Sequence, residues 1–396
     1  MDRPGLPSHN RFDPTGTSAL RRIRREEHVL DAVAVYFSRV SVPMYTHEKA
    51  TLSVVAKSIA RLDGHRFVGE FDPKANAASR LLFVPSDTLM LDEARELGIH
   101  SSRQLYGAVV PYAFVKTKAI THRLIGTHSA QPSGWSSAFA QNVRSATLPG
   151  YTAFCAEDAR LAAARLLALG PLRLKEPLGD GGHGQTTVGS MAALEAYLEN
   201  IPAEKLSSHG LVLETNLLHI ITRSVGSTTI GNRAIAYHGT QRTVTNNHGL
   251  SVYGGSQLIC VRGGWSALEA LPMEAESRLA VNQARTYDRN AAKYPGFLAS
   301  RRNYDVGQGI DGRGQWRSGV FEASWRSGGA STAELAALTA FANDPGLQVV
   351  ETASVKEYGN PRKIPVGAAV HFHGDDPEEG PLIRYTIAAR ALRQAA

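Results

Sequence analysis

The chain contains only two cysteines, Cys155 and Cys260, which lie far apart and belong to no Cys-x-x-Cys pair. Two isolated cysteines argue against a disulfide framework and a structural zinc site, and they fit a reducing compartment. No apolar run approaches the roughly 18 residues of a membrane-spanning helix. The first apolar stretch, 29–37, is interrupted by Asp31 and has no cleavage-site pattern. We therefore expect a cytoplasmic protein that is not secreted and has no membrane partner.

An internal repeat and a nucleic-acid-binding module pattern are also missing, so we expect no nucleic-acid partner. The 43 Lys and Arg against 36 Asp and Glu give a net charge of +7, which favours small anions such as nucleotides, phosphates and carboxylates. Part of this excess lies in residues 1–30, which we expect to form a basic, flexible tail.

At 396 residues the chain is long enough for roughly two or three packed units. Apolar strands at 32–37, 81–85 and 107–111, with an amphipathic helix over 48–61, predict an α/β lobe with parallel strands over 31–115. Two further units are expected, over 116–209 and over 210–396. The segment 131–148 is interpreted as a loop or weak helix at a junction.

The rest of the pattern predicts alternating helices and strands. Helices are expected over 157–169, 190–200, 275–292, 331–341 and 387–393. Ser331 and Glu334 have the spacing of a capping box at the start of the fourth of these helices. Strands are expected over 172–175, 210–214, 220–244 as hairpins, and near 370.

The most informative segment is the glycine loop 175–188, in which Gly179, Gly181, Gly182 and Gly184 occur within six positions. Glycine lets backbone N–H groups approach phosphate oxygens without obstruction by a Cβ atom, so a phosphate site is one interpretation. A mobile surface loop is the other.

Two phosphate motifs fit the loop poorly. The dinucleotide fingerprint needs a helix directly after its glycines, whereas the β-branched residues of 185–189 favour a strand. A Walker A loop needs a lysine where Gln185 stands. The basic residue here precedes the loop, at Lys175.

A lysine on a strand followed by a glycine flap resembles the ATP-grasp superfamily, and the spacing is similar to that of its biotin carboxylase branch. The resemblance implies that Lys175 contacts the nucleotide phosphates and that Gly181, Gly182, His183 and Gly184 close over them. Upstream, Lys118 resembles the lysine that opens the ATP-grasp domain, at the start of a helix expected to run through Leu124. Downstream, Glu214, Thr215, Asn216 and Leu217 resemble the hinge that holds adenine and ribose.

The segment 319–331 resembles the strand that ends in Glu-x-Asn-x-Arg followed by glycines. Strand alternation places Glu322, Ser324 and Arg326 on one face, so two oxygen ligands and a cation converge. The hairpin before it resembles the one that brings in the family's other metal carboxylate, for which Asp305 is the candidate. This chain departs from the family because Ser324 replaces asparagine and no second hinge glutamate appears within the eight residues after Glu214. Since magnesium accepts hydroxyl and water oxygens, the resemblance still implies a metal set of Asp305, Glu322 and Ser324.

The resemblance implies an α/β (α+β) ATP-grasp fold with an N-terminal pre-ATP-grasp lobe, from a bacterial family. It also implies ATP and Mg2+ or Mn2+ as cofactors, Arg326 and Lys175 as catalytic residues, and a ligase joining a small-molecule carboxylate to an amine-type acceptor through an acyl phosphate. A phosphotransferase and a catalytically degenerate ATP-binding regulatory protein remain alternatives, and the oligomeric state is open, a homodimer being one option. His371 and His373 have a metal-like spacing but no third ligand, and we assign them no role.

Overall fold

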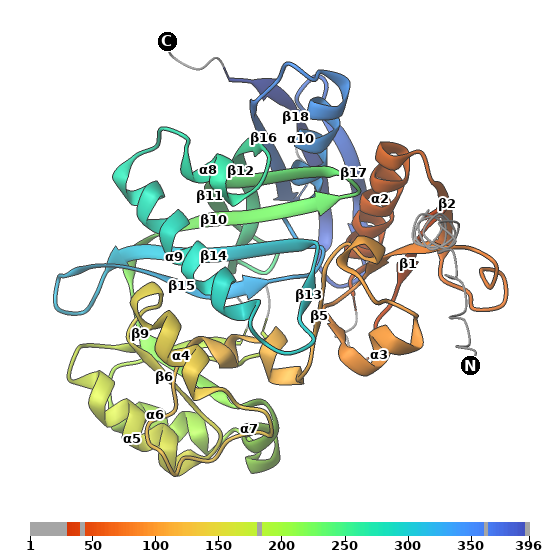
Figure 1. The fold of residues 1–396 in the computed structure, drawn as a ribbon. Coiled ribbons are helices and arrows are strands. Elements are labelled where there is room, and N and C mark those ends of the chain that lie inside the picture. Colours follow the sequence, from red (N-terminus) through yellow and green to blue (C-terminus); the bar gives the residue numbers. More distant parts are fainter. Residues whose placement is uncertain (1–29, 40–43, 180–183, 360–362, 393–396) are drawn as a thin grey trace, which may run out of the picture.

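The computed structural model describes residues 30–39, 44–179, 184–359 and 363–392 (Figure 1). The N-terminal lobe is a parallel sheet in the order β2-β1-β3, made of β1 (Ala32–Tyr36), β2 (Arg66–Glu70) and β3 (Leu81–Pro85). Helix α2 (Thr46–Asp63) connects β1 to β2 and packs its apolar face on this sheet. The parallel pairing predicted for this lobe is therefore confirmed.

The strand expected at 107–111 belongs to a different sheet from the one predicted. Strand β5 (Ala108–Val110) pairs with β4 (Leu89–Met90) and with β13 (Leu298–Ala299), a strand from the second half of the chain. Helix α3 (Leu91–Glu96) lies between β4 and β5 in the chain. The small sheet thus joins the N-terminal lobe to the rest of the molecule, a long-range pairing that local pattern does not encode.

A third sheet has the order β6-β9-β7-β8, with every pair antiparallel. Its strands are β6 (Gly150–Ala153), β7 (Leu172–Lys175), β8 (Gln185–Val188) and β9 (Leu211–Thr215). Helices α5 (Ala156–Leu167), α6 (Met191–Leu198) and α7 (Ala203–His209) supply the remaining apolar residues of its core. The predicted helices over 157–169 and 190–200 are confirmed, and Ser190 caps α6 by accepting the Ala193 N–H at 3.2 Å.

The largest sheet has eight strands in the order β15-β14-β10-β11-β12-β16-β18-β17, again all antiparallel. The strands are β10 (Leu218–Ile230), β11 (Arg233–Thr245), β12 (Ser251–Arg262), β14 (Arg301–Ile310), β15 (Trp316–Ser324), β16 (Val349–Tyr358), β17 (Ala369–Asp376) and β18 (Gly380–Ala391). Helices α8 (Trp265–Glu269) and α9 (Ala275–Ala291) pack on one face, and α10 (Ser331–Asn343) and α2 pack on the other. The architecture confirms the predicted fold class, an α/β (α+β) chain with an N-terminal α/β lobe, and it adds two antiparallel sheets.

Three local predictions need correction. Residues 387–391 of the helix expected over 387–393 belong to β18, because pairing with β16 outweighs the helix propensity of their alanines and arginines. The helix expected to open at Lys118 is a 3₁₀ turn, Lys118–Thr121, and the chain is extended at His122. The junction segment 131–148, expected to be a loop or weak helix, contains the short helix α4 (Ser137–Val143) and agrees with that expectation. Glu334 forms no capping box, because its carboxylate is buried and pairs with Arg301.

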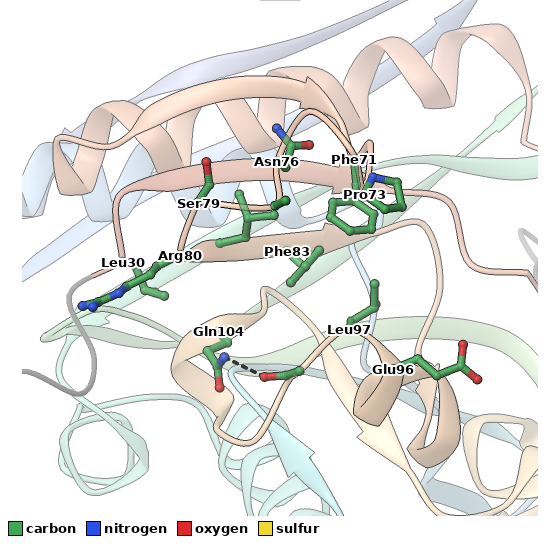
Figure 2. Close-up of a pocket in the computed structure, with 13 residues that line it drawn as sticks. Leu30, Phe71, Pro73, Asn76, Ser79, Arg80, Phe83, Glu96, Leu97 and Gln104 are labelled. Atoms are coloured by element: carbon green, nitrogen blue, oxygen red, sulfur yellow. Dashed lines mark hydrogen bonds between the residues drawn. The ribbon is translucent and has the colours of Figure 1, made fainter.

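The described residues were searched for a membrane-spanning helix and for cavities that could bind a ligand. No helix in the described ranges is long and apolar enough to cross a lipid bilayer. A cavity of about 340 Å³ lies on the N-terminal lobe between Phe71, Phe83 and Leu97, with Arg80 and Gln104 at its rim (Figure 2). None of the residues predicted to bind the nucleotide lines this cavity.

The buried histidines His47 and His238 make the fold acid-sensitive. Burial, together with nearby cations, lowers the pKa of each from 6.5 to about 4. The unfolded chain therefore binds more protons than the folded chain between those values, and stability present above pH 6.5 is lost as the pH falls toward 4. We expect the free energy of unfolding in urea to fall by about 1–3 kcal/mol for each histidine over this window.

His238→Gln should flatten this pH dependence, whereas His128→Gln, at an exposed position, should leave it unchanged. An identical pH profile for all three proteins would contradict the assignment.

Candidate active site

Lys175, at the end of β7, is buried and forms the centre of the predicted site. Its Nζ pairs with Glu214 Oε1 on the neighbouring strand β9, and it lies 4.5 Å from the centroid of the Phe321 ring. The other oxygen of Glu214 is 3.0 Å from His122 Nε2. Burial lowers the pKa of Lys175, whereas Lys175 and His122 overcome burial and hold the pKa of Glu214 at about 2. The lysine is thus held in place by a carboxylate that stays ionised.

Lys118 connects the glycine loop to the opposite sheet. Its Nζ donates to the backbone carbonyl of Gly179 and lies 3.2 Å from Glu322 Oε1 on β15. The neighbouring Lys116 instead pairs with Asp87 Oδ2 at 2.6 Å, away from these groups. Of the two lysines, the structure therefore brings Lys118 to the predicted phosphate site.

Asp305 and Glu322 are directly opposite each other on the antiparallel strands β14 and β15. Burial and the charge of Glu322 raise the pKa of Asp305 from 3.8 to about 7. Asn303 donates to Asp305 Oδ1 at 2.9 Å, and Ser324 is opposite Asn303. Two carboxylates that disfavour each other's charge fit a site that is completed by a divalent cation.

The donor types also fit magnesium or manganese. The side chains that converge here offer only oxygen, which these ions prefer. Within the described ranges no group of three or more His, Cys, Asp and Glu side chains surrounds a common point. That is compatible with Mg2+, which is often held by one or two carboxylates while waters and substrate phosphates complete its shell.

A β-bulge in β15 brings Phe321 to the site. Asp305 pairs with Glu322 and Val306 pairs with Val320, so Phe321 is the extra residue between them. Its ring lies against Gly307 of β14, where an added Cβ atom would be 2.7 Å from the ring carbons. A side chain at position 307 would collide with the Phe321 ring, so only glycine allows the ring to lie here.

Gly307→Ala should therefore displace Phe321 from Lys175. We expect a loss of about 1–3 kcal/mol in the free energy of unfolding, as for other overpacked sites, together with weaker binding of Mg-ATP measured by titration calorimetry. Gly189→Ala is the matched control, because an added Cβ there meets no atom within 4 Å. Unchanged stability and nucleotide binding in Gly307→Ala would refute the proposed role of the ring.

The glycine loop joins two antiparallel strands. Glu176 N–H donates to the Gly184 carbonyl at 2.8 Å, and β8 begins directly after Gly184. A strand in this place is incompatible with the dinucleotide fingerprint and with a P-loop, because both require a helix there. Gly181, Gly182 and His183 lie outside the described residues, so their contact with phosphate remains a prediction.

Two backbone N–H groups of the predicted hinge donate to protein carbonyls. Thr215 N–H donates to the Pro149 carbonyl at 3.0 Å, and Asn216 N–H donates to the Pro171 carbonyl at 3.1 Å. Arg173 donates to the Asn216 side chain at 2.8 Å, and Leu217 is buried. Glu214 contacts Lys175 and His122 instead of being free for a ribose.

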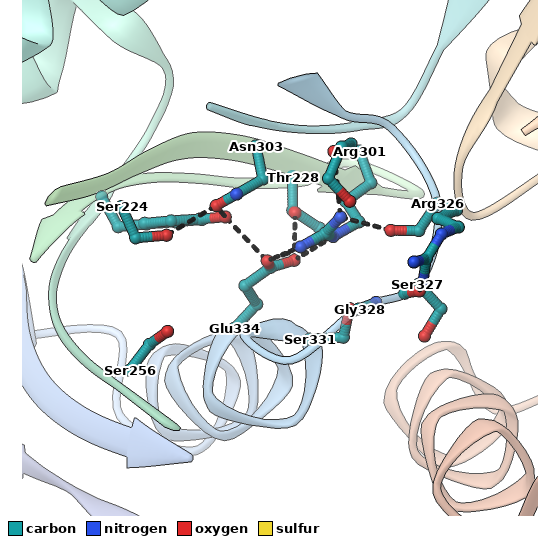
Figure 3. Close-up of polar contacts among 12 residues, drawn as sticks. Ser224, Thr228, Ser256, Arg301, Asn303, Arg326, Ser327, Gly328, Ser331 and Glu334 are labelled. Carbon is teal, nitrogen blue, oxygen red and sulfur yellow. Dashed lines mark hydrogen bonds and ion pairs between the residues drawn. The ribbon is translucent and has the colours of Figure 1, made fainter. Parts of the chain in front are cut away.

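A buried polar network supports the end of β15 (Figure 3). Arg301 Nη2 is 2.7 Å from Glu334 Oε1, and both side chains are almost fully buried. The hydroxyls of Tyr106, Thr228 and Tyr237 donate to the same carboxylate at 2.8, 2.7 and 2.7 Å. Arg301 also donates to the backbone carbonyls of Ser324 and Arg326. The network thereby fixes the backbone that carries the predicted metal and phosphate residues.

Arg326 itself extends toward the N-terminal lobe. Its Nε is 4.0 Å from Asp87 Oδ1, and its Nη1 donates to the Ser327 carbonyl at 3.0 Å.

The sequence analysis assigned no role in the site to five residues that the structure brings into contact with it: His122, Phe321, Asn303, Arg301 and Glu334. A histidine directly after a 3₁₀ turn, or an arginine at the start of a strand, gives no local signal of these contacts. The available sign was the spacing of Ser331 and Glu334, which was misinterpreted as a capping box.

The fold and the site together define a class of protein. Two antiparallel sheets carry a strand lysine with a glycine loop, a connecting strand and an acid-bearing hairpin, which is the ATP-grasp arrangement. Within that class the chain belongs to the family described as "Protein of unknown function (DUF3182)", whose model matches residues 35–386. No curated protein matches the chain.

Several solved structures are similar to it over most of its length. An N5-carboxyaminoimidazole ribonucleotide synthetase, solved as an ADP complex, is 12% identical with a TM-score of 0.49, covering 91% of this chain and 93% of that one. A phosphoribosylamine–glycine ligase from Thermotoga maritima has the same identity and TM-score, covering 91% and 92%. The biotin carboxylase domain of the Hydrogenobacter thermophilus 2-oxoglutarate carboxylase, in complex with MgADP and bicarbonate, is 12% identical with a TM-score of 0.46, covering 92% and 87%. The functional assignment below rests on this chain's own residues.

Proposed function

We propose that this protein is an ATP- and Mg2+-dependent ligase. It activates a small-molecule carboxylate as an acyl phosphate, which an amine or similar nucleophile then attacks. The observation that carries the proposal is the convergence of two cations and two acids from four separate segments. Lys118 contacts Glu322, Lys175 lies over the neighbouring Phe321, and Asp305 is opposite Glu322.

The roles follow from charge and position. Lys118 and Lys175 offset the negative charge of the triphosphate, and Arg326 offsets charge on the transferred phosphoryl group. Asp305 and Glu322 are the residues that would hold the cation, with Ser324 beside them. When bound, the cation neutralises phosphate oxygens and aligns the terminal phosphoryl group for in-line transfer. Gly184 and its neighbours in the loop would exclude water from the reactive acyl phosphate.

The test is ATP turnover by the purified protein with Mg2+ and a library of carboxylic acids. We expect ADP to be released only with the correct acid, and hydroxylamine to trap the acyl phosphate as a hydroxamate. Stable phosphorylated product with no hydroxamate would identify a phosphotransferase instead. ATP binding without ADP release under any condition would remove the enzyme assignment.

A second candidate function is an ATP-binding regulatory protein without turnover. It is favoured by Ser324, which stands where the resemblance implies a metal-binding asparagine, because a weaker metal site would slow phosphoryl transfer while the lysines could still bind the nucleotide. Turnover numbers from the acid library, compared with the affinity for Mg-ATP, separate the two functions.

A further inference from the structure

His122 is a buried histidine that directly follows the 3₁₀ turn Lys118–Thr121 and faces Glu214. Its Nε2 is 3.0 Å from Glu214 Oε2, whereas the other oxygen of the carboxylate, Oε1, pairs with Lys175. Each of the three side chains is at most 3% exposed. Glu214 therefore lies between a histidine and a lysine proposed to bind phosphate, with one oxygen toward each.

The charge of Glu214 decides which nitrogen of His122 carries a proton. Burial opposes the ionisation of Glu214, but Lys175 and His122 outweigh burial and hold its pKa at about 2. The carboxylate is thus ionised at neutral pH and can only accept hydrogen bonds, so His122 must donate from Nε2. A buried carboxylate oxygen without a donor is costly. His122 therefore fixes the orientation of the carboxyl group and leaves only Oε1 for Lys175.

The backbone on both sides of His122 is anchored to β6. Thr152 of this strand donates its hydroxyl to the Ala119 carbonyl at 2.7 Å and its N–H to the Arg123 carbonyl at 3.0 Å. The His122 ring also lies against Gly150 of the same strand, where an added Cβ atom would be 2.7 Å from a ring carbon. The position of the ring is therefore set by the fold and not by the carboxylate alone.

The same 3₁₀ turn begins with Lys118, the other lysine proposed to bind phosphate. Lys118 Nζ lies 3.2 Å from Glu322 Oε1, on the opposite side of the proposed site. One short turn thus carries Lys118 itself and, four residues later, the histidine that contacts the carboxylate partner of Lys175.

The ammonium group of Lys175 can donate more hydrogen bonds than the protein accepts. It has three N–H donors, and in the part of the chain that the structure describes its hydrogen-bonding partner is Glu214 Oε1. Two donors are left for phosphate oxygens as long as the second oxygen of Glu214 stays with His122. Without His122 both carboxylate oxygens can turn toward Lys175 and occupy these donors.

We propose that His122 is a positioning residue of the nucleotide site, which keeps one oxygen of Glu214 away from Lys175 so that the lysine can bind phosphate. The inference rests on the proposed function and adds a residue that acts on the nucleotide only through Lys175. It also gives Glu214 a role different from the predicted contact with ribose.

The experiment measures the affinity of the whole chain for Mg-ATP by titration calorimetry. We expect His122→Leu to weaken binding about 10-fold or more, the scale on which losing an orienting partner weakens a ligand site. His122→Gln retains an N–H group at the same distance along the side chain and should restore most of the affinity. In a Lys175→Met background His122→Leu should have no further effect, because the group through which it acts is gone. His209→Leu, at an exposed position at the end of α7, is the control and should bind as wild type.

The inference is overturned if His122→Leu binds Mg-ATP as tightly as wild type, if His122→Gln binds no tighter than His122→Leu, or if the effects of His122→Leu and Lys175→Met simply add. Thermal unfolding of each variant shows that it is folded. Failure of the wild-type protein to bind Mg-ATP would refute the proposed function and this inference together. Wild-type binding without turnover would remove the ligase reaction alone, because the role of His122 concerns binding of the phosphates.

Discussion

Glu322→Gln is expected to reduce ATP turnover about 100- to 1,000-fold, the loss typical when one electrostatic stabiliser of the transition state is removed. The carboxylate is opposite Asp305 and contacts Lys118, so its neutralisation removes both a proposed metal ligand and the partner of a lysine proposed to bind phosphate. Mn2+ affinity, measured by electron paramagnetic resonance, should fall in parallel with turnover.

The control for this variant is Glu199→Gln, at an exposed position at the end of α6. It should leave turnover and Mn2+ affinity unchanged. If Glu322→Gln retained normal Mn2+ binding, the metal assignment would be wrong even if turnover fell.

The largest expected effect on stability comes from Glu334→Gln. Glu334 is buried and accepts hydrogen bonds from Arg301, Tyr106, Thr228 and Tyr237, so its neutralisation leaves a buried guanidinium without a counter-charge. Breaking a buried ion pair in this way costs about 3–5 kcal/mol. Urea denaturation should show that loss, and we expect turnover to fall as well, because Arg301 holds the Ser324 and Arg326 carbonyls.

The exposed pair Arg160–Glu195 provides the comparison. Both side chains are partly in water, at 47% and 39% exposure, so Glu195→Gln should cost less than about 1 kcal/mol. The double variant Arg301→Met with Glu334→Leu should recover part of the lost stability, because no unpaired charge remains. A loss of similar size for Glu334→Gln and Glu195→Gln would contradict this account of the network.

Elements with strong local signals could be predicted from the sequence. Helices α5, α6 and α9 and the β10–β11 hairpin each follow from periodicity, caps and turn residues, whereas the hairpin carrying Asp305 and Glu322 was expected from the ATP-grasp resemblance. The strand after the glycine loop was predicted from its β-branched residues. Elements whose state depends on distant partners were not predictable. Strand β18 resembles a helix in composition. The strand β5 was predicted, but its pairing with a strand almost 200 residues further along the chain was not.

The sequence by itself determined which residue types are available for phosphate and metal chemistry, because glycine spacing, a strand lysine and alternating Glu322 and Ser324 are local patterns. Only the tertiary structure decided which of them meet. In the structure Glu214 contacts Lys175 and His122. Lys118 contacts Glu322, whereas Lys116 pairs with Asp87 instead. Glu334 pairs with Arg301 and does not cap a helix. The physical reason is that burial and long-range pairing set the strength of a charge interaction, and neither is encoded by spacing along the chain.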